Sequence, residues 1–246
     1  MAELTATLSA ASRPRPAWRS ERVFFTTVSV LLAAVVFAGF APTYYLRSAY
    51  RAEPLARVFQ VHGAIFTAWI LLLVAQTTLV AGRRVDLHRK LGVAGAVLAV
   101  VMLLAGYEAA MTAARRGFSV PGLPPPLVFL AVPLFDLIVF PTLVGAALLL
   151  RGSPAAHKRL MILATVAILP AAVARLPQLL PYGPLMFFGL SDLFVVACLV
   201  YDRVSRGAMH PATIWGGLFL VTSQVARLAV SGTAAWMAFA RWLTGA

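Results

Sequence analysis

Charged residues are scarce in this chain of 246 residues. Only 12% are Asp, Glu, Lys or Arg, about half of the ~25% that is usual in soluble domains. A soluble protein of this length needs more polar surface, and a disordered chain needs more still. With 61% apolar residues, the composition leaves one class, an integral membrane protein.

Cysteine and the familiar catalytic motifs are also missing. The single Cys198 lies in an apolar run, so no intrachain disulfide can form. The chain has no CxxC, HExxH, P-loop, dinucleotide fingerprint or GxSxG. We therefore assign no catalytic residue and expect a protein that is not an enzyme.

Seven apolar blocks are long enough, or nearly so, to cross a bilayer as helices. None alternates as a barrel strand would, which predicts an all-α polytopic bundle of residues 23–246 behind a mobile basic tail, residues 1–22. The last block is longer than a span needs, which predicts that it projects beyond the bilayer or ends in an interfacial helix around Trp236 and Trp242. The blocks are Val23–Tyr45, Val58–Ala81, Leu91–Ala114, Leu127–Leu150, Leu160–Leu176, Leu185–Tyr201 and Ala212–Ala240.

Most of the basic residues behind the net charge of +13 lie between these blocks. There they indicate topology and contacts with lipid headgroups, not a nucleic acid partner. Counted along seven spans, 13 Lys or Arg fall on the side of the tail and 6 on the other. The positive-inside rule then places the N-terminus in the cytoplasm and the C-terminus outside, in a bacterial cytoplasmic (inner) membrane.

Two helix pairs have similar sequences, which predicts a tandem repeat. Asp136 and Asp192 lie in the fourth and sixth blocks, and an Arg-Gly and then a His follow each of them. Each pair then reaches Val-Ala-Arg-Leu, at 173–176 and 225–228.

Six ionisable residues lie inside the apolar blocks. Each costs at least ~2.5–3.5 kcal/mol at mid-bilayer unless paired or hydrated, so they are expected to face the bundle interior. Counting the helical rise places them about 17–30 Å from the side of the tail. Two interpretations remain open: structural ion pairs of Asp136 with Arg175 and Asp192 with Arg227, or a polar ligand-binding cluster in the outer half. The six are His62, Glu108, Asp136, Arg175, Asp192 and Arg227.

Three histidines, His88, His157 and His210, lie at helix starts on the side of the tail. Asp86, Ser153 and His210 itself are the predicted N-caps. One interpretation makes these histidines packing and capping residues. The other makes His88 and His157 ligands of a haem iron or another metal.

The segments Leu87–Gly92 (LHRKLG) and His157–Met161 (HKRLM) resemble motifs of uncharacterised bacterial multi-helix membrane proteins. That resemblance extends over blocks two to seven. The same histidines, over about a dozen residues, also resemble ascorbate-type two-haem cytochromes b, in which four histidines hold one haem on each side of the membrane. Here three of the four histidines share one side, so the resemblance implies at most one bis-histidine haem, with His88 and His157.

Two functions follow as expectations. The first is a non-enzymatic protein that binds a solute or an ion at the outer polar cluster, or is a subunit of a membrane complex with a protein partner. The alternative is a membrane electron carrier with haem b. Membrane lipids are partners in both.

Overall fold

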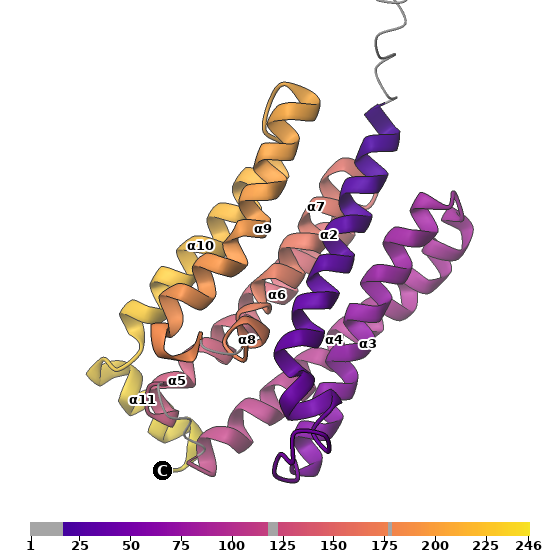
Figure 1. Cartoon of the computed structure of the whole chain (residues 1–246). Helices are drawn as coiled ribbons and strands as arrows, with labels where there is room; N and C mark the ends of the chain where they lie inside the picture. The colour runs from indigo at the N-terminus through magenta and orange to yellow at the C-terminus, as the bar shows by residue number, and fades with distance from the viewer. Residues whose placement is uncertain (1–16, 118–122, 177–178) are drawn as a thin grey trace, which may run out of the picture.

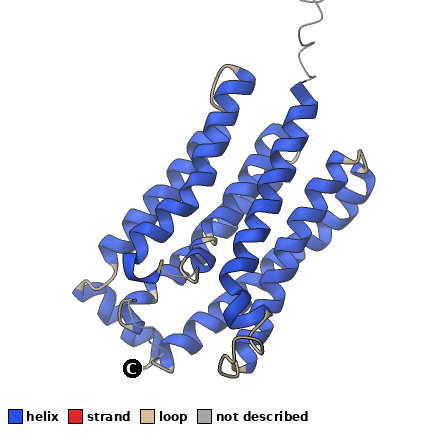
Figure 2. Ribbon diagram, viewed as in Figure 1, coloured by secondary structure: helices blue, strands red, loops and turns tan. Residues whose placement is uncertain are grey.

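The computed structural model describes residues 17–117, 123–176 and 179–246, and within them every regular element is a helix (Figure 2). This confirms the predicted all-α bundle. A backbone in hydrocarbon must satisfy its own hydrogen bonds, which a helix does within one segment. The elements are α2 (Ala17–Phe40), η1 (Ala41–Tyr45), α3 (Arg57–Ala81), α4 (Val85–Arg115), α5 (Pro126–Phe129), α6 (Ala131–Leu149), α7 (Pro154–Ala167), α8 (Pro170–Val173), η2 (Leu180–Tyr182), α9 (Gly183–Arg206), α10 (Pro211–Val230) and α11 (Ala234–Thr244).

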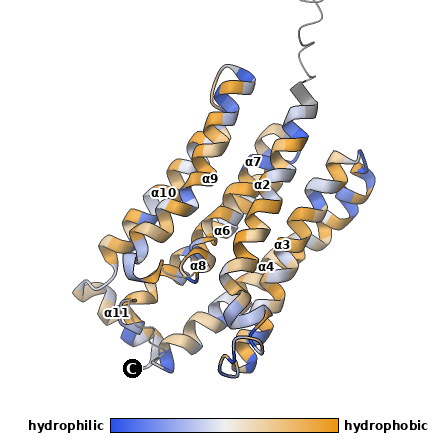
Figure 3. Cartoon of the chain, in the orientation of Figure 1, coloured by the Kyte–Doolittle hydropathy of each residue, from blue (hydrophilic) through white to orange (hydrophobic). Residues whose placement is uncertain are grey.

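Seven of the helical segments are long and apolar enough to cross a membrane. The chain therefore has the architecture of a multi-pass membrane protein, as predicted. The turns α3–α4, α6–α7 and α9–α10 lie at the end of the bundle where α2 begins, here called the N-terminal end (Figure 1). Hydrophobic residues cover the middle of the helices, and hydrophilic ones concentrate at the turns (Figure 3).

Helices extend beyond several of the predicted apolar blocks. Helix α2 begins at Ala17, so the end of the predicted tail, residues 17–22, is helical, while residues 1–16 lie outside the described residues. Helix α4 begins at Val85 and α9 continues to Arg206. Asp86 is therefore a first-turn residue and not the predicted N-cap, which is Arg84. Ser153 and His210 are N-caps as predicted.

Helix α7 is the centre of the bundle. In the span that contains it, 72% of the most apolar stretch is buried, against 17–39% in the other six. It packs against α2, α6, α9 and α10. Because α7 faces protein on all sides, it can carry polar side chains that a lipid-facing helix could not.

Small residues bring the helices around this core into close contact. A Cβ at Gly39 would lie 2.1 Å from the carbonyl oxygen of Ala172, so only glycine lets α2 approach α8 this closely. Similarly, a Cβ at Gly216 of α10 would lie 2.7 Å from Cδ1 of Leu163 on α7.

The C-terminal segment forms a separate helix, α11, as the long seventh block predicted. Trp236 is buried against α5, and its Nε1 donates to the carbonyl oxygen of Leu127 at 2.8 Å. Trp242 on the same helix is 76% exposed. Buried and exposed tryptophans on one short helix are typical of an anchor at a membrane surface.

Candidate functional site

His88 and His157 face each other at the N-terminal end of the bundle. His88 lies in the first turn of α4 and His157 in the first turn of α7. Their ring centroids are 6.2 Å apart and the ring planes are 84° to one another. The structure thus brings together the two histidines that the sequence predicted as ligands, although α4 and α7 themselves do not pack closely.

The two imidazoles have different hydrogen-bond partners. Nδ1 of His157 lies 2.8 Å from the carbonyl oxygen of Ala147, and because a carbonyl can only accept, Nδ1 carries the proton. Nδ1 of His88 is buried beside the carbonyl of Gln76 but makes no hydrogen bond of good geometry. Oε1 of Gln76 is also buried without a partner. Unsatisfied buried polar atoms are rare, and each one requires a physical explanation.

The Nε2 atoms of both histidines remain available. No described residue hydrogen-bonds to either, and neither is a fully buried atom. Both side chains are half-buried. An imidazole whose Nδ1–H is directed at a carbonyl and whose Nε2 is free has the orientation that metal-bound histidines adopt.

The basic residues beside these histidines have different environments. Arg89 and Lys90 are exposed on α4 next to His88. Lys158, beside His157, lies 2.6 Å from the carboxylate of Glu21. Free cationic charge near the pair therefore comes from α4.

His210 is not part of this pair. It caps α10, because its Nδ1 accepts a hydrogen bond from the backbone nitrogen of Ala212 at 3.0 Å. Burial and the charges of Arg159, Arg206 and Lys158 lower its pKa from the usual 6.5, against the smaller opposing effect of Asp202. Within the described residues, no group of three or more His, Cys, Asp or Glu side chains is arranged to hold a metal ion.

Arg227 and Asp136 form the ion pair of the opposite half. Nη1 of Arg227 lies 2.6 Å from Oδ1 of Asp136. The guanidinium also contacts the carbonyl of Val132 at 3.4 Å, and the hydroxyl of Ser223 at 3.2 Å. The predicted pairing of Arg227 with Asp192 is therefore wrong, because α10 packs directly against α6 and directs Arg227 toward it.

The other predicted pair, Asp136 with Arg175, is also absent. Asp192 instead accepts a hydrogen bond from Nε2 of Gln224 at 2.9 Å. Arg175 bonds the carbonyl of Ala171 at 2.5 Å and lies over the ring of Phe40 at 4.6 Å. The two predicted repeats thus place their acid and arginine in different contacts, and the duplication stays a prediction.

His62 and Glu108 share a shallow groove of about 330 Å³ between α3 and α4, which Arg57, Val58, Val61 and Ala105 complete. Nδ1 of His62 lies 3.3 Å from the carbonyl oxygen of Ala105, and its ring stacks on Phe66. The six predicted cluster residues therefore lie in four separate places: the Arg227–Asp136 ion pair, Asp192 with its Gln224 hydrogen bond, the groove of His62 and Glu108, and Arg175 just after α8.

The sequence analysis missed a second, more buried cluster, formed by Arg159 with Glu21, Lys158, Asp202, His210 and Thr213. Nε of Arg159 donates to both carboxylate oxygens of Asp202, at 2.9 and 3.2 Å, and Nη2 donates to Oδ1 as well. The hydroxyl of Thr213 and the backbone nitrogen of His210 complete the shell of Asp202, at 2.6 and 3.2 Å. Arg159 is 0% exposed.

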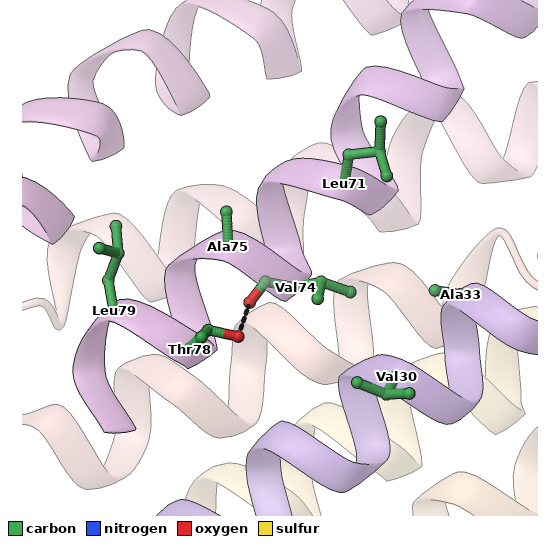
Figure 4. A pocket seen from close by; sticks show the side chains of 7 residues that line it. All are labelled: Val30, Ala33, Leu71, Val74, Ala75, Thr78 and Leu79. Atoms are coloured by element: carbon green, nitrogen blue, oxygen red, sulfur yellow. Dashed lines mark hydrogen bonds between the residues drawn. The ribbon is translucent and has the colours of Figure 1, made fainter. Parts of the chain in front are cut away.

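An apolar groove of about 550 Å³ runs between α2 and α3 (Figure 4). It is lined by Val30, Ala33, Leu71, Val74, Ala75, Thr78 and Leu79. The hydroxyl of Thr78 donates to the carbonyl of Val74 on its own helix at 2.8 Å, which leaves the groove without a free polar donor (Figure 4). The groove suits an acyl chain and has no means of orienting a polar ligand.

No family model, curated protein or solved structure matches this chain.

Proposed function

We propose that this chain is a membrane electron carrier that holds one haem b between His88 and His157. The observation that carries the proposal is the 6.2 Å separation of the two ring centroids. Two imidazoles that held one iron between their Nε2 atoms would have ring centroids about 6 Å apart, because a metal–nitrogen bond is about 2 Å long and the ring centroid lies about 1.1 Å further.

The partners of the imidazoles support the same function. The Nδ1–H of His157 bonds the Ala147 carbonyl, which directs Nε2 away from α6. Exposed Arg89 and Lys90 beside His88 offer cationic partners for haem propionates. The unsatisfied Nδ1 of His88 is explained if its ring turns slightly when a ligand binds.

Bound haem would supply one-electron chemistry. His88 and His157 would both hold the iron, and the protein would then leave no site on the metal for oxygen or a substrate. The role of this chain would be to hold the haem iron, to exclude reactions at the iron and to hold it close to one membrane surface. That role is electron transfer and not catalysis at the metal.

The orientation belongs to the proposal too. We propose that the histidine pair lies at the cytoplasmic face of a bacterial inner membrane, which the split of 13 and 6 basic residues supports. The electron partner, a protein of the same membrane complex or a soluble reductant, would then meet the haem near the α3–α4 and α6–α7 turns.

The test is an absorption spectrum of the purified protein, oxidised and reduced, with a pyridine haemochrome assay. We expect a Soret band that His88→Ala and His157→Ala each abolish. His62→Ala, at the opposite end of the bundle, is the matched control and should retain the band. A protein without a Soret band after haem supplementation, or bands unchanged in both variants, would overturn the proposal, and metal analysis would then show whether zinc or copper replaces haem.

A second candidate is a cation site in the other half of the bundle. The observation that favours it is that Asp136 and Asp192 lie against the same face of α10, where Arg227 neutralises one carboxylate and Gln224 bonds the other. Stabilisation by sodium or potassium ions in a thermal unfolding assay, lost in Asp192→Asn, would support this function. Equal stability in both salts and in choline chloride would remove it.

A further inference from the structure

The groove between α3 and α4 carries a positive and a negative side chain that do not pair with each other. Arg57, the first residue of α3, and Glu108 of α4 are both exposed, and both line the groove with His62. Among the described residues neither belongs to an ion pair, and Glu108 accepts a hydrogen bond from the hydroxyl of Thr112 on its own helix at 3.4 Å. Opposite charges that share a groove without neutralising each other are complementary to a ligand that carries both charges.

Both charges lie at a depth where lipid headgroups meet hydrocarbon. Helix α4 has 31 residues, so at about 1.5 Å per residue it is about 46 Å long, against a hydrocarbon core of about 30 Å. A centred α4 extends about 8 Å beyond the core at each end, and Glu108 lies about 10 Å before its last residue, Arg115. Arg57 begins α3 at the same end of the bundle (Figure 1). Both side chains are therefore within reach of the polar part of a phospholipid.

The negative side of the groove offers two hydrogen-bond acceptors. Nδ1 of His62 lies 3.3 Å from the carbonyl oxygen of Ala105, and because a carbonyl can only accept, Nδ1 carries the proton and Nε2 is an acceptor. No described residue hydrogen-bonds to this Nε2, and the carboxylate of Glu108 is the second acceptor. A primary ammonium has three N–H donors and a quaternary ammonium has none, so this side of the groove favours a primary ammonium.

The positive side of the groove suits a phosphate. The N-cap of α3, Ala56, makes no side-chain hydrogen bond to the first turn of the helix. The start of α3 therefore adds the positive end of a helix dipole and uncapped amides to the charge of Arg57, which is the combination that binds phosphate at helix N-termini.

An apolar stripe on α4 continues from Glu108 toward the middle of the membrane. Val97, Val101 and Leu104 are exposed, and their spacing places them within about 40° of Glu108 around the helix. Val58 and Val61 of α3 line the groove beside this stripe. An acyl chain attached to a headgroup in the groove can therefore lie along α4.

We infer that this groove binds phosphatidylethanolamine, with its phosphate at Arg57 and its ammonium between Glu108 and His62. The headgroup carries the two charges in the order in which the groove presents their partners, and its acyl chains follow the stripe on α4. The inference goes beyond the proposed function, because His88 and His157 lie at the other end of the bundle.

The first experiment needs no variant. Native mass spectrometry of the purified protein measures the affinity for phosphatidylethanolamine and for its N-methyl, N,N-dimethyl and choline analogues with the same acyl chains. The affinity should fall with each N–H lost, to about 10-fold weaker for phosphatidylcholine, since hydrogen bonds between charged groups are the strong ones. Equal affinities for phosphatidylethanolamine and phosphatidylcholine overturn the inference, and so does phosphatidylglycerol that binds as tightly as phosphatidylethanolamine.

The second experiment assigns the preference to the groove. Glu108→Gln should lower the affinity for phosphatidylethanolamine to that for phosphatidylcholine, whereas Arg57→Gln should weaken the binding of both lipids. Glu53→Gln is the matched control, because Glu53 is exposed before α3 and does not line the groove. Thermal unfolding without added lipid checks that each variant is folded. A folded Glu108→Gln protein that keeps the wild-type preference for phosphatidylethanolamine overturns the inference, whatever the outcome for haem.

Discussion

The bundle contains two buried arginines, Arg159 and Arg227, whose positive charges are compensated in different ways. Arg159, near the N-terminal end, is fully buried against Asp202, and that carboxylate also receives Thr213 and His210. Arg227, in the opposite half, faces Asp136, whose side chain keeps 22% of its surface and receives no other described donor. The carboxylate of Asp202 has four hydrogen-bond donors, so its hydrogen bonding is satisfied within the protein. The carboxylate of Asp136 has a single cationic partner and remains partly exposed, so it can still interact with a ligand.

The difference follows from the neighbours of each arginine. Arg159 lies on α7, the helix surrounded by four others, and joins α2, α7, α9 and α10 through its cluster. Arg227 lies between the rings of Phe135 and Phe188 at 5.7 and 5.4 Å, so aromatic faces supply part of its environment. The Arg159 cluster therefore joins four helices at the N-terminal end, the end at which His88 and His157 also lie.

The largest expected effect concerns which of these clusters faces the cytoplasm. The basic split of 13 to 6 predicts that the Arg159 end is cytoplasmic. A reporter that works only outside the cytoplasm, fused after Ala246, should be active, and the same reporter in the α3–α4 turn should be inactive. The opposite pattern would invert the orientation and place the histidine pair outside.

Asp202→Ala should be the most destabilising single change in either cluster. It leaves Arg159 buried and without its main partner, which costs about 3–5 kcal/mol. Unfolding titrations in detergent measure the loss. Replacing both partners, with Arg159→Met and Asp202→Leu, should recover much of it. Equal stability of Asp202→Ala and wild type would mean that the cluster is not a structural unit.

The sequence predicted the architecture better than it predicted these contacts. Apolar length determines where helices cross, because hydrocarbon thickness sets the requirement, and all seven spans occur where expected. Pairing depends on how helices rotate and pack, which counting depth along each helix does not include. Depth therefore left Arg227 with more than one acid at comparable depth, and packing of α10 on α6 pairs it with Asp136 and not with the expected Asp192.

Arg159 was missed for a related reason. It follows Lys158 at a helix start, where basic residues usually meet lipid headgroups. The available signal was the scarcity of acids: the chain has only eight Asp and Glu residues, and three of them, Glu21, Asp86 and Asp202, lie at the same end as Arg159. An Asp or Glu at a basic membrane face is expected to have a cationic side chain as its partner, and this rule would have indicated the Arg159 cluster.

A double-mutant cycle tests whether Arg227 and Asp136 act as a pair. Arg227→Leu and Asp136→Asn should show a coupling of about 1–2 kcal/mol in the free energy of unfolding. The coupling should be smaller than the cost of Asp202→Ala, because Asp136 keeps part of its surface. Asp192→Asn should be additive with Arg227→Leu within about 0.5 kcal/mol. Coupling to Asp192 instead would restore the pairing that was expected from the sequence.

The smallest expected effect is a pH dependence of stability that arises from His210 in the Arg159 cluster. Its pKa lies below the usual 6.5 in the folded protein, so the unfolded chain takes up a proton first as the pH falls. The contribution of His210 is therefore complete above pH 6.5 and declines below it, as the pH approaches the folded pKa. The cap also requires an unprotonated Nδ1, since this atom accepts from the nitrogen of Ala212. His210→Asn keeps a capping oxygen and should flatten the pH dependence of stability below 6.5, whereas His210→Ala should cost about 1 kcal/mol at pH 7.5. Unfolding titrations of the three proteins between pH 5 and 8 measure both effects, and a wild-type curve parallel to that of His210→Asn would show that His210 does not link the Arg159 cluster to pH.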